Sequence, residues 1–158
     1  MNLFPLFQWF EATTIGTIVR ESLWQFPVIE CVHLLALALL GGVVLAVDLR
    51  LLGLGLKSQS AARLDAKLRP WLLAALVTMI ATGVPMFLSE AVKCYYSPPF
   101  WYKIQMLMVA IAFTFTFRRR VAVASGERNR PVLNRLTAFT SLGLWFCVAF
   151  AGRWIAFY

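Results

Sequence analysis

Four long apolar stretches, separated by short polar segments, constrain this chain more than any other feature. The first, residues 27–47, is apolar enough to cross a bilayer as one helix of roughly 31 Å. Similar stretches follow at about 71–88, 100–117 and 136–158. With 61% hydrophobic and only 14% charged residues, the chain carries too little charge for a soluble domain. The sequence therefore predicts an all-α protein in which residues 1–158 form one integral membrane domain, a four-helix transmembrane bundle.

The segments outside the four stretches have two different characters. Residues of about 5–22 are too polar to span a bilayer, because Gln8, Glu11 and Arg20 are interleaved with apolar side chains. This pattern predicts an amphipathic helix that lies in the membrane interface. The connection 93–100 contains two adjacent prolines, which cannot continue a helix, so it predicts a short, stiff link.

The distribution of positive charge predicts the topology. Eleven of the fifteen cations lie in two segments, between the first and second stretches and between the third and fourth. The positive-inside rule places both segments in the cytoplasm and both termini outside. This arrangement accounts for the net charge of +8 without a nucleic acid partner. The expected partner is the lipid bilayer, and a homo-oligomer or a larger membrane complex stays open.

The first stretch carries three ionisable residues that a lipid-facing helix would not tolerate. Glu30, His33 and Asp48 fall on one helical face, and His33 is the only histidine in the chain. This face is expected to point into protein, with Gly41-Gly42 allowing another helix to approach closely. Asp48 with Arg50 is interpreted as a helix-end ion pair rather than a proton relay.

Ionisable residues from all four stretches are predicted to reach similar depths, within about 10 Å of the outer surface. The predicted polar network, with Asp48 added from the first stretch, consists of Glu30, His33, Asp48, Glu90, Lys103 and Arg153. Buried charges of this kind are usually paired and functional. Simpler interpretations stay open, because Lys103 and Arg153 can extend to water from helix ends and Glu30 can pair with His33.

Motifs of enzymes and soluble metal sites are missing from the sequence. There is no Walker loop, GxSxG, HExxH or dinucleotide fingerprint, so no enzyme activity is predicted. Cys31, Cys94 and Cys147 have no CxxC spacing. A disulfide between Cys31 and Cys94 is possible, and free buried thiols are the alternative.

Four segments carry a resemblance to a known family: SLWQFPVIECVH, GGVVLAVDLRLLG, FWYKIQMLMVAIAF and AGRWIAF. They resemble an uncharacterised bacterial family of four-helix inner-membrane proteins, classed as a domain of unknown function, over nearly the whole chain. A looser similarity extends to CopD-type copper-resistance proteins and cytochrome b561-like bundles, which implies haem b held between histidines of different helices. This chain departs from that pattern, because it lacks the second histidine.

Three functional hypotheses follow. The first is a redox module in which His33 is the axial ligand of haem b. The residues proposed around that cofactor are Met86 or Met106 as a sixth ligand and Lys103 and Arg153 as partners of the propionates. Five-coordinate haem, or two His33 residues across a dimer, are alternatives to methionine ligation.

The second hypothesis is an uptake protein for copper or protons. Its candidate residues are Cys31, His33, Met86 and Met106 as soft metal ligands, or Glu30 and Asp48 as relay acids. The third hypothesis is an accessory subunit without cofactor, in which the polar cluster only holds the helices together.

Overall fold

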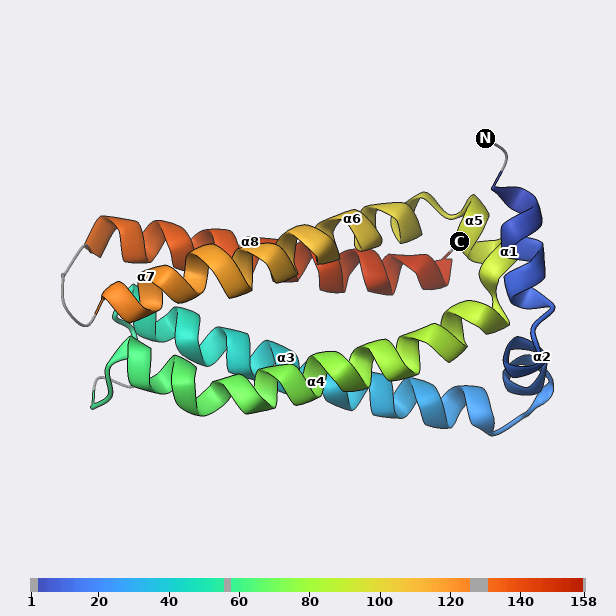
Figure 1. The fold of residues 1–158 in the computed structure, drawn as a ribbon, viewed down its shortest axis with the longest axis horizontal. Coiled ribbons are helices and arrows are strands. Elements are labelled where there is room, and N and C mark those ends of the chain that lie inside the picture. The colour runs from blue at the N-terminus through green and yellow to red at the C-terminus, as the bar shows by residue number, and fades with distance from the viewer. Residues whose placement is uncertain (1–2, 56–57, 126–130, 158) are drawn as a thin grey trace.

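A computed structural model of the chain describes residues 3–55, 58–125 and 131–157, and every regular element in these ranges is a helix. Four long helices run side by side (Figure 1). They are α3 (Gln25–Leu52), α4 (Ala61–Ser89), the continuous run Pro98–Ala124 and α8 (Pro131–Trp154). All four are long and apolar enough to cross a membrane, which confirms the predicted all-α bundle.

Capping signals explain why these helices extend beyond the apolar stretches. Helix α3 continues to Leu52 and stops at Gly53, whose φ of 79° lies in the left-handed region that glycine adopts without strain. Helix α4 begins after Ser60, whose hydroxyl accepts a hydrogen bond from the Arg63 N–H over 3.3 Å. The third run changes character within its length: α6 (Pro98–Phe113), the π-helix η1 (Thr114–Arg118) and α7 (Arg119–Ala124).

The core of the bundle lies midway along the long helices. Side chains of four helices are almost fully buried there, with Leu40, Val44, Ala75, Ala110 and Val148 at 3% exposure or less. Lipid tails are as apolar as these side chains, so the contacts stabilise the bundle through close packing rather than through exclusion of water. The polar groups that join the helices consequently carry much of the specificity of their arrangement.

Three short helices cover the end of the bundle where both termini of the described chain lie (Figure 1). They are α1 (Phe4–Glu11), α2 (Thr14–Glu21) and α5 (Ala91–Tyr96), and η2 (Ile155–Phe157) extends α8 at the same end. The single amphipathic helix predicted at 5–22 is therefore two helices. Thr13 separates them, because its hydroxyl donates to the Phe10 carbonyl and caps α2 by accepting from Gly16 N–H.

The three short helices α1, α2 and α5, which we call the cap, are packed against the bundle rather than lying freely on it. A Cβ atom on Gly16 would come within 2.5 Å of the Leu88 carbonyl oxygen, so α2 touches the last turn of α4 backbone to backbone. The link predicted without helix at 93–100 also contains α5, and the two prolines instead open α6.

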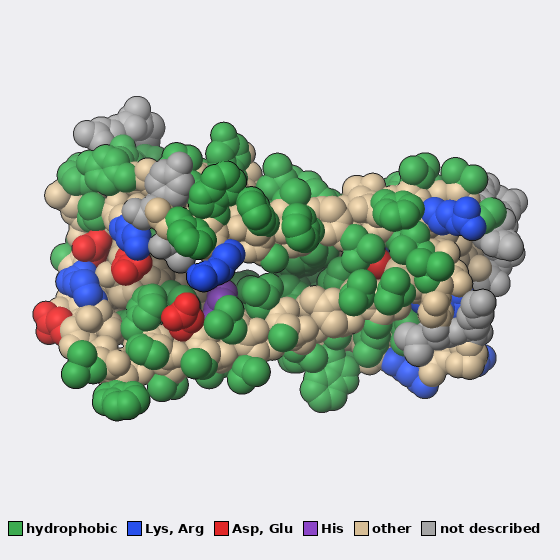
Figure 2. Space-filling view, turned by 180° about the vertical axis from the view of Figure 1, so that it is seen from behind, with side chains coloured by type: hydrophobic (Ala, Val, Ile, Leu, Met, Phe, Trp, Pro, Cys, Tyr) green, Lys and Arg blue, Asp and Glu red, His purple; other side chains and the backbone are tan. Residues whose placement is uncertain are grey.

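The described residues of both basic segments lie at the opposite end of the bundle, where lysine and arginine side chains gather (Figure 2). The predicted arrangement of segments and termini at opposite ends is thus present. Which end faces the cytoplasm stays a prediction.

Candidate functional site

His33 is half-buried on α3 and is held by α4. Its Nδ1 lies 2.8 Å from the hydroxyl oxygen of Thr82, and that hydroxyl donates its own proton to the Thr78 carbonyl over 2.7 Å. Because Thr82 has one proton and it is already engaged, the Thr82 oxygen accepts and Nδ1–H donates. We therefore assign the neutral ring the Nδ1–H tautomer, in which Nε2 keeps a free lone pair.

A glycine makes room for this ring. Gly83 follows Thr82 on α4, and a Cβ atom there would lie 3.4 Å from His33 Cε1. That distance is at the near edge of ordinary van der Waals contact, so the imidazole packs directly against the α4 backbone at this position. The seat of His33 is thus built from a hydrogen-bond partner and an adjacent position without a side chain.

Two adjoining cavities share His33 in their walls. The outer one, about 300 Å³, is the more polar of the two, and its lining includes Glu30, His33, Met86, Glu90, Cys94 and Lys103. The inner one, about 470 Å³, is almost wholly apolar, and all four long helices and Phe7 of α1 line it. Gly83, Phe87, Phe100 and Lys103 also belong to both walls, so His33 and Lys103 lie where the polar compartment meets the apolar one.

Lys103 reaches this position from α6. Its Cε and Nζ lie 3.4 Å from where a Cβ on Gly152 of α8 would be, so a second glycine seats a second site residue. In the described part of the chain, Lys103 forms no salt bridge. Figure 2 shows the purple His33 at a hollow in the surface, with basic and acidic side chains beside it.

The structure brings together part of the predicted network. Glu30, His33, Glu90, Lys103 and Met86 line the outer cavity, although Glu30 is exposed and forms no hydrogen bond with His33. Glu90 instead forms a salt bridge of 3.7 Å with Lys93 in the next turn.

Other predicted residues lie elsewhere. Met106 is exposed on the outer face of α6, and Arg153 is exposed with its guanidinium 5.4 Å from the Phe157 ring centroid. Asp48 is fifteen positions beyond His33 on α3, roughly 22 Å along the helix axis, at the end with the basic segments. It does not belong to the outer cavity.

The predicted Asp48–Arg50 pair is wrong. Asp48 is fully buried and accepts a hydrogen bond from Arg118 Nε over 2.8 Å, whereas Arg50 Nε donates to the Gln59 carbonyl. Sequence reasoning had assigned Arg118 to a basic loop. The π-helix that ends at Arg118 turns this side chain inward. No pattern in the sequence predicts this π-helix.

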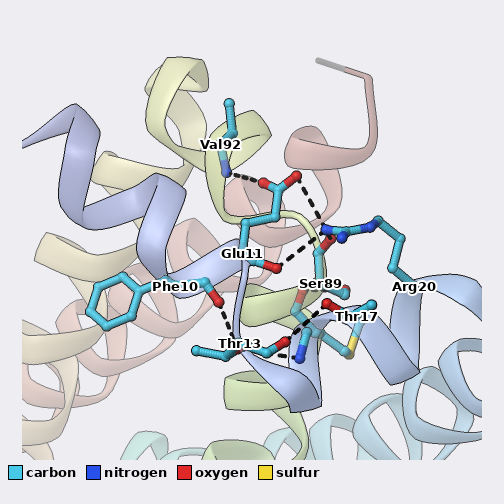
Figure 3. A network of polar contacts seen from close by, with 9 residues as sticks. Phe10, Glu11, Thr13, Thr17, Arg20, Ser89 and Val92 are labelled. Carbon is cyan, nitrogen blue, oxygen red and sulfur yellow. Dashed lines mark hydrogen bonds and ion pairs between the residues drawn. The ribbon is translucent and has the colours of Figure 1, made fainter.

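A polar network anchors the cap above the outer cavity (Figure 3). The Glu11 carboxylate accepts from the Val92 N–H over 2.6 Å and forms a 3.2 Å salt bridge with Arg20. Arg20 also donates to the Ser89 carbonyl, so α1, α2, the end of α4 and α5 are tied together. Phe7 packs beneath this network on Phe87, Tyr95 and Trp101, with ring centroids 5.2–5.7 Å apart.

The cysteines are free thiols, so the possible Cys31–Cys94 disulfide is not formed. Cys31 and Cys147 are exposed on the bundle surface, whereas Cys94 is buried. Burial, and secondly the neighbouring Glu90 carboxylate, raise the pKa of the Cys94 thiol to about 11. In the described ranges no three histidine, cysteine or acidic side chains are grouped to hold a metal ion.

Comparison with known families gives one match. A family of unknown function, DUF6644, matches residues 6–158. The chain belongs to this family. DUF6644 thus accounts for the predicted resemblance to a family of unknown function, and its match begins within α1 and includes every later helix. No curated protein and no solved structure matches the chain, so the looser similarity to CopD-type and cytochrome b561-like proteins stays a prediction.

Proposed function

We propose that this protein is a membrane redox module that binds haem b, with His33 Nε2 as the iron ligand. The observation that carries the proposal is the hydrogen bond from His33 Nδ1 to Thr82. Histidines that bind metals characteristically donate their other ring N–H to a fixed acceptor, which orients the ring and raises the basicity of the free nitrogen. His33 has this arrangement, and its ring borders both cavities.

The two cavities suit an amphipathic ligand with an apolar body and an anionic edge. The apolar compartment of about 470 Å³ lies within the size range of ligand sites, and aromatic rings of Phe87, Phe100 and Trp145 line it. Lys103, without an acidic partner in the described residues, stands at its polar end and would hold a propionate. Haem bound there would supply one-electron chemistry near the outer face of the membrane.

The residues around His33 narrow the choice of the sixth iron ligand and of the propionate partners. Met86 lines the same cavity as His33, whereas Met106 is exposed and lines neither cavity beside His33, so Met86 is the thioether proposed for the sixth position. Five-coordinate haem is the alternative. Arg153, exposed beside Phe157, is proposed as a propionate partner only at the outer rim.

The test is an absorption spectrum of detergent-purified protein expressed with haem supplied. We expect a Soret band in the wild type, its loss or displacement in His33→Ala, and an unchanged band in the matched control Met106→Ala. A haem spectrum that His33→Ala leaves unaltered contradicts the assigned ligand. A colourless wild-type protein contradicts haem binding altogether.

The second candidate, an accessory subunit without cofactor, is favoured by a different observation. The buried Asp48–Arg118 pair joins α3 to the third transmembrane helix and needs no external ligand. In this case polar groups serve helix packing alone, and the protein is colourless and metal-free. Copper uptake receives less support, because Cys31 and Met106, two of its candidate ligands, are exposed away from His33.

A further inference from the structure

A second polar cluster lies near the end of the bundle that carries the basic segments. Asp48 of α3, Arg118 of η1 and Ser141 of α8 are each at most 1% exposed. Arg118 Nε donates to Asp48 Oδ1 over 2.8 Å, and Ser141 is the next polar side chain beside this carboxylate. Three segments distant in the sequence therefore meet at one buried charge pair.

The π-helix η1 places Arg118 in this cluster. A π-turn contains an extra residue relative to an α-turn, so it changes the direction of the side chains that follow. At its start, Thr114 is buried and its hydroxyl accepts a hydrogen bond of 3.1 Å from Trp145 Nε1 of α8. Arg118 consequently points inward, while Arg119 and Arg120 are exposed.

Within the part of the chain that the structure describes, three buried atoms of the cluster have no hydrogen-bond partner. They are Asp48 Oδ2, Arg118 Nη2 and Ser141 Oγ. Ser141 lies close enough to interact with the Asp48 carboxylate, but its hydroxyl forms no hydrogen bond of good geometry with it, and the guanidinium engages only one carboxylate oxygen. Unpaired polar groups inside a bilayer are costly, and buried groups of this kind are normally satisfied by protein or by ordered water.

The chemistry of the three atoms defines the ligand. The carboxylate oxygen accepts, the guanidinium nitrogen donates, and the serine hydroxyl does either. A metal cation is disfavoured by the guanidinium and an anion by the carboxylate. A neutral molecule that donates and accepts at once fits all three, and the smallest is water, which needs two to four polar partners in a buried site.

We infer that Asp48, Arg118 and Ser141 form a binding site for one buried water molecule, which bridges α3, η1 and α8 at the π-helix. The water donates to Asp48 Oδ2, accepts from Arg118 Nη2 and exchanges a hydrogen bond with Ser141 Oγ. The water thereby links the Asp48–Arg118 ion pair to Ser141, so that all three helices are connected by hydrogen bonds. This site is separate from the proposed haem site, because neither cavity beside His33 includes any of its residues.

The test compares the full-length wild type with Ser141→Val, Ser141→Ala and the control Thr140→Val, whose side chain is exposed on the same helix. An experimental structure at a resolution of about 2 Å should contain a density peak within hydrogen-bond distance of all three atoms. Ser141→Val replaces the hydroxyl with a methyl group and adds a second methyl group, so it should displace the water, lowering the melting temperature by on the order of 5–10 °C. Thr140→Val should have little effect.

Ser141→Ala keeps two of the three partners, so it should retain the density and lose less stability than Ser141→Val. The inference is overturned if Asp48 Oδ2 and Arg118 Nη2 bond directly to each other or to Ser141 with no density between them. It is also overturned if Ser141→Val melts at the same temperature as Thr140→Val.

Discussion

Thr82 fixes the tautomer of His33, because its hydroxyl gives its only proton to the Thr78 carbonyl and accepts the Nδ1–H of the imidazole over 2.8 Å. The orientation of the free Nε2 is thereby set by Thr82, a residue of α4 that lies outside the predicted polar network. The chemistry proposed for His33 consequently depends on α4 as much as on α3.

Replacing Thr82 with Val should therefore weaken haem binding without removing the ligand. The isosteric change deletes the acceptor and frees the ring to rotate, and losing such a partner typically costs 10–100-fold in metal affinity. Haem titration followed at the Soret band measures this. Thr78→Val is the matched control, because the Thr78 hydroxyl bonds only to the Ala74 carbonyl of its own helix. Equal affinities in both variants would exclude the positioning role of Thr82.

The Asp48–Arg118 pair should behave as a buried unit in stability measurements. Asp48→Leu or Arg118→Met alone leaves the partner as an uncompensated buried charge, and we expect a loss of about 3–5 kcal/mol in unfolding free energy. The double variant Asp48→Leu with Arg118→Met should recover much of this loss, because both charges leave together. Thermal unfolding in detergent, with the exposed Arg119→Met as control, separates this from additive losses.

The four long helices could be predicted from the sequence, because each carries a long apolar stretch. The placement of Glu30, Glu90 and Lys103 around one cavity could also be predicted, because the depth of a residue follows from the helical rise. The sequence was insufficient where one residue changes the direction of the chain. Thr13 splits the predicted interfacial helix, and the π-helix buries Arg118. Both features depend on tertiary contacts, Gly16 with Leu88 and Arg118 with Asp48. The hydrophobic periodicity of the sequence does not encode such contacts.

Gly16→Val should detach α2 from the bundle. A Cβ atom there meets the Leu88 carbonyl at 2.5 Å, and backbone on both sides cannot yield as a side chain does. We expect faster hydrogen exchange in α1 and α2 and easier proteolysis near Thr13, with the core of the bundle intact. Gly42→Ala is the control, since its added Cβ meets nothing within 4 Å and should be neutral or slightly stabilising. Unchanged exchange in Gly16→Val would show that the cap is not held by this contact.

The orientation of the bundle in the membrane is open to direct labelling. The positive-inside rule predicts that the two basic segments face the cytoplasm. Single cysteines introduced at Ser58 and Ser125, which lie in those segments, should react with a membrane-impermeant maleimide only after the cells are opened. A cysteine at partly exposed Ser22, beside the cap, should react in intact cells. The opposite pattern would invert the predicted topology.

The thiol of Cys94 should show a displaced pH dependence. Its pKa is about 11 because burial and the Glu90 carboxylate disfavour the thiolate, whereas an unperturbed cysteine titrates near 8.5. At pH 7 its thiolate fraction is then roughly 300-fold below that of an ordinary cysteine, and alkylation tracks the thiolate. In a Cys31→Ser/Cys147→Ser background, the iodoacetamide rate should rise about tenfold per pH unit through pH 10.

The raised pKa of Cys94 also makes the stability of the folded protein depend on pH. The folded state holds the Cys94 proton more tightly than the unfolded chain, so this contribution is complete below the unfolded pKa near 8.5 and is lost as pH rises toward 11. The difference in melting temperature between this background and its Cys94→Ser derivative should therefore change between pH 8 and 11 and be constant below pH 8. An alkylation rate that levels off near pH 9, as it should for a cysteine placed at Ser58, would show that Cys94 is solvated rather than buried against the outer cavity.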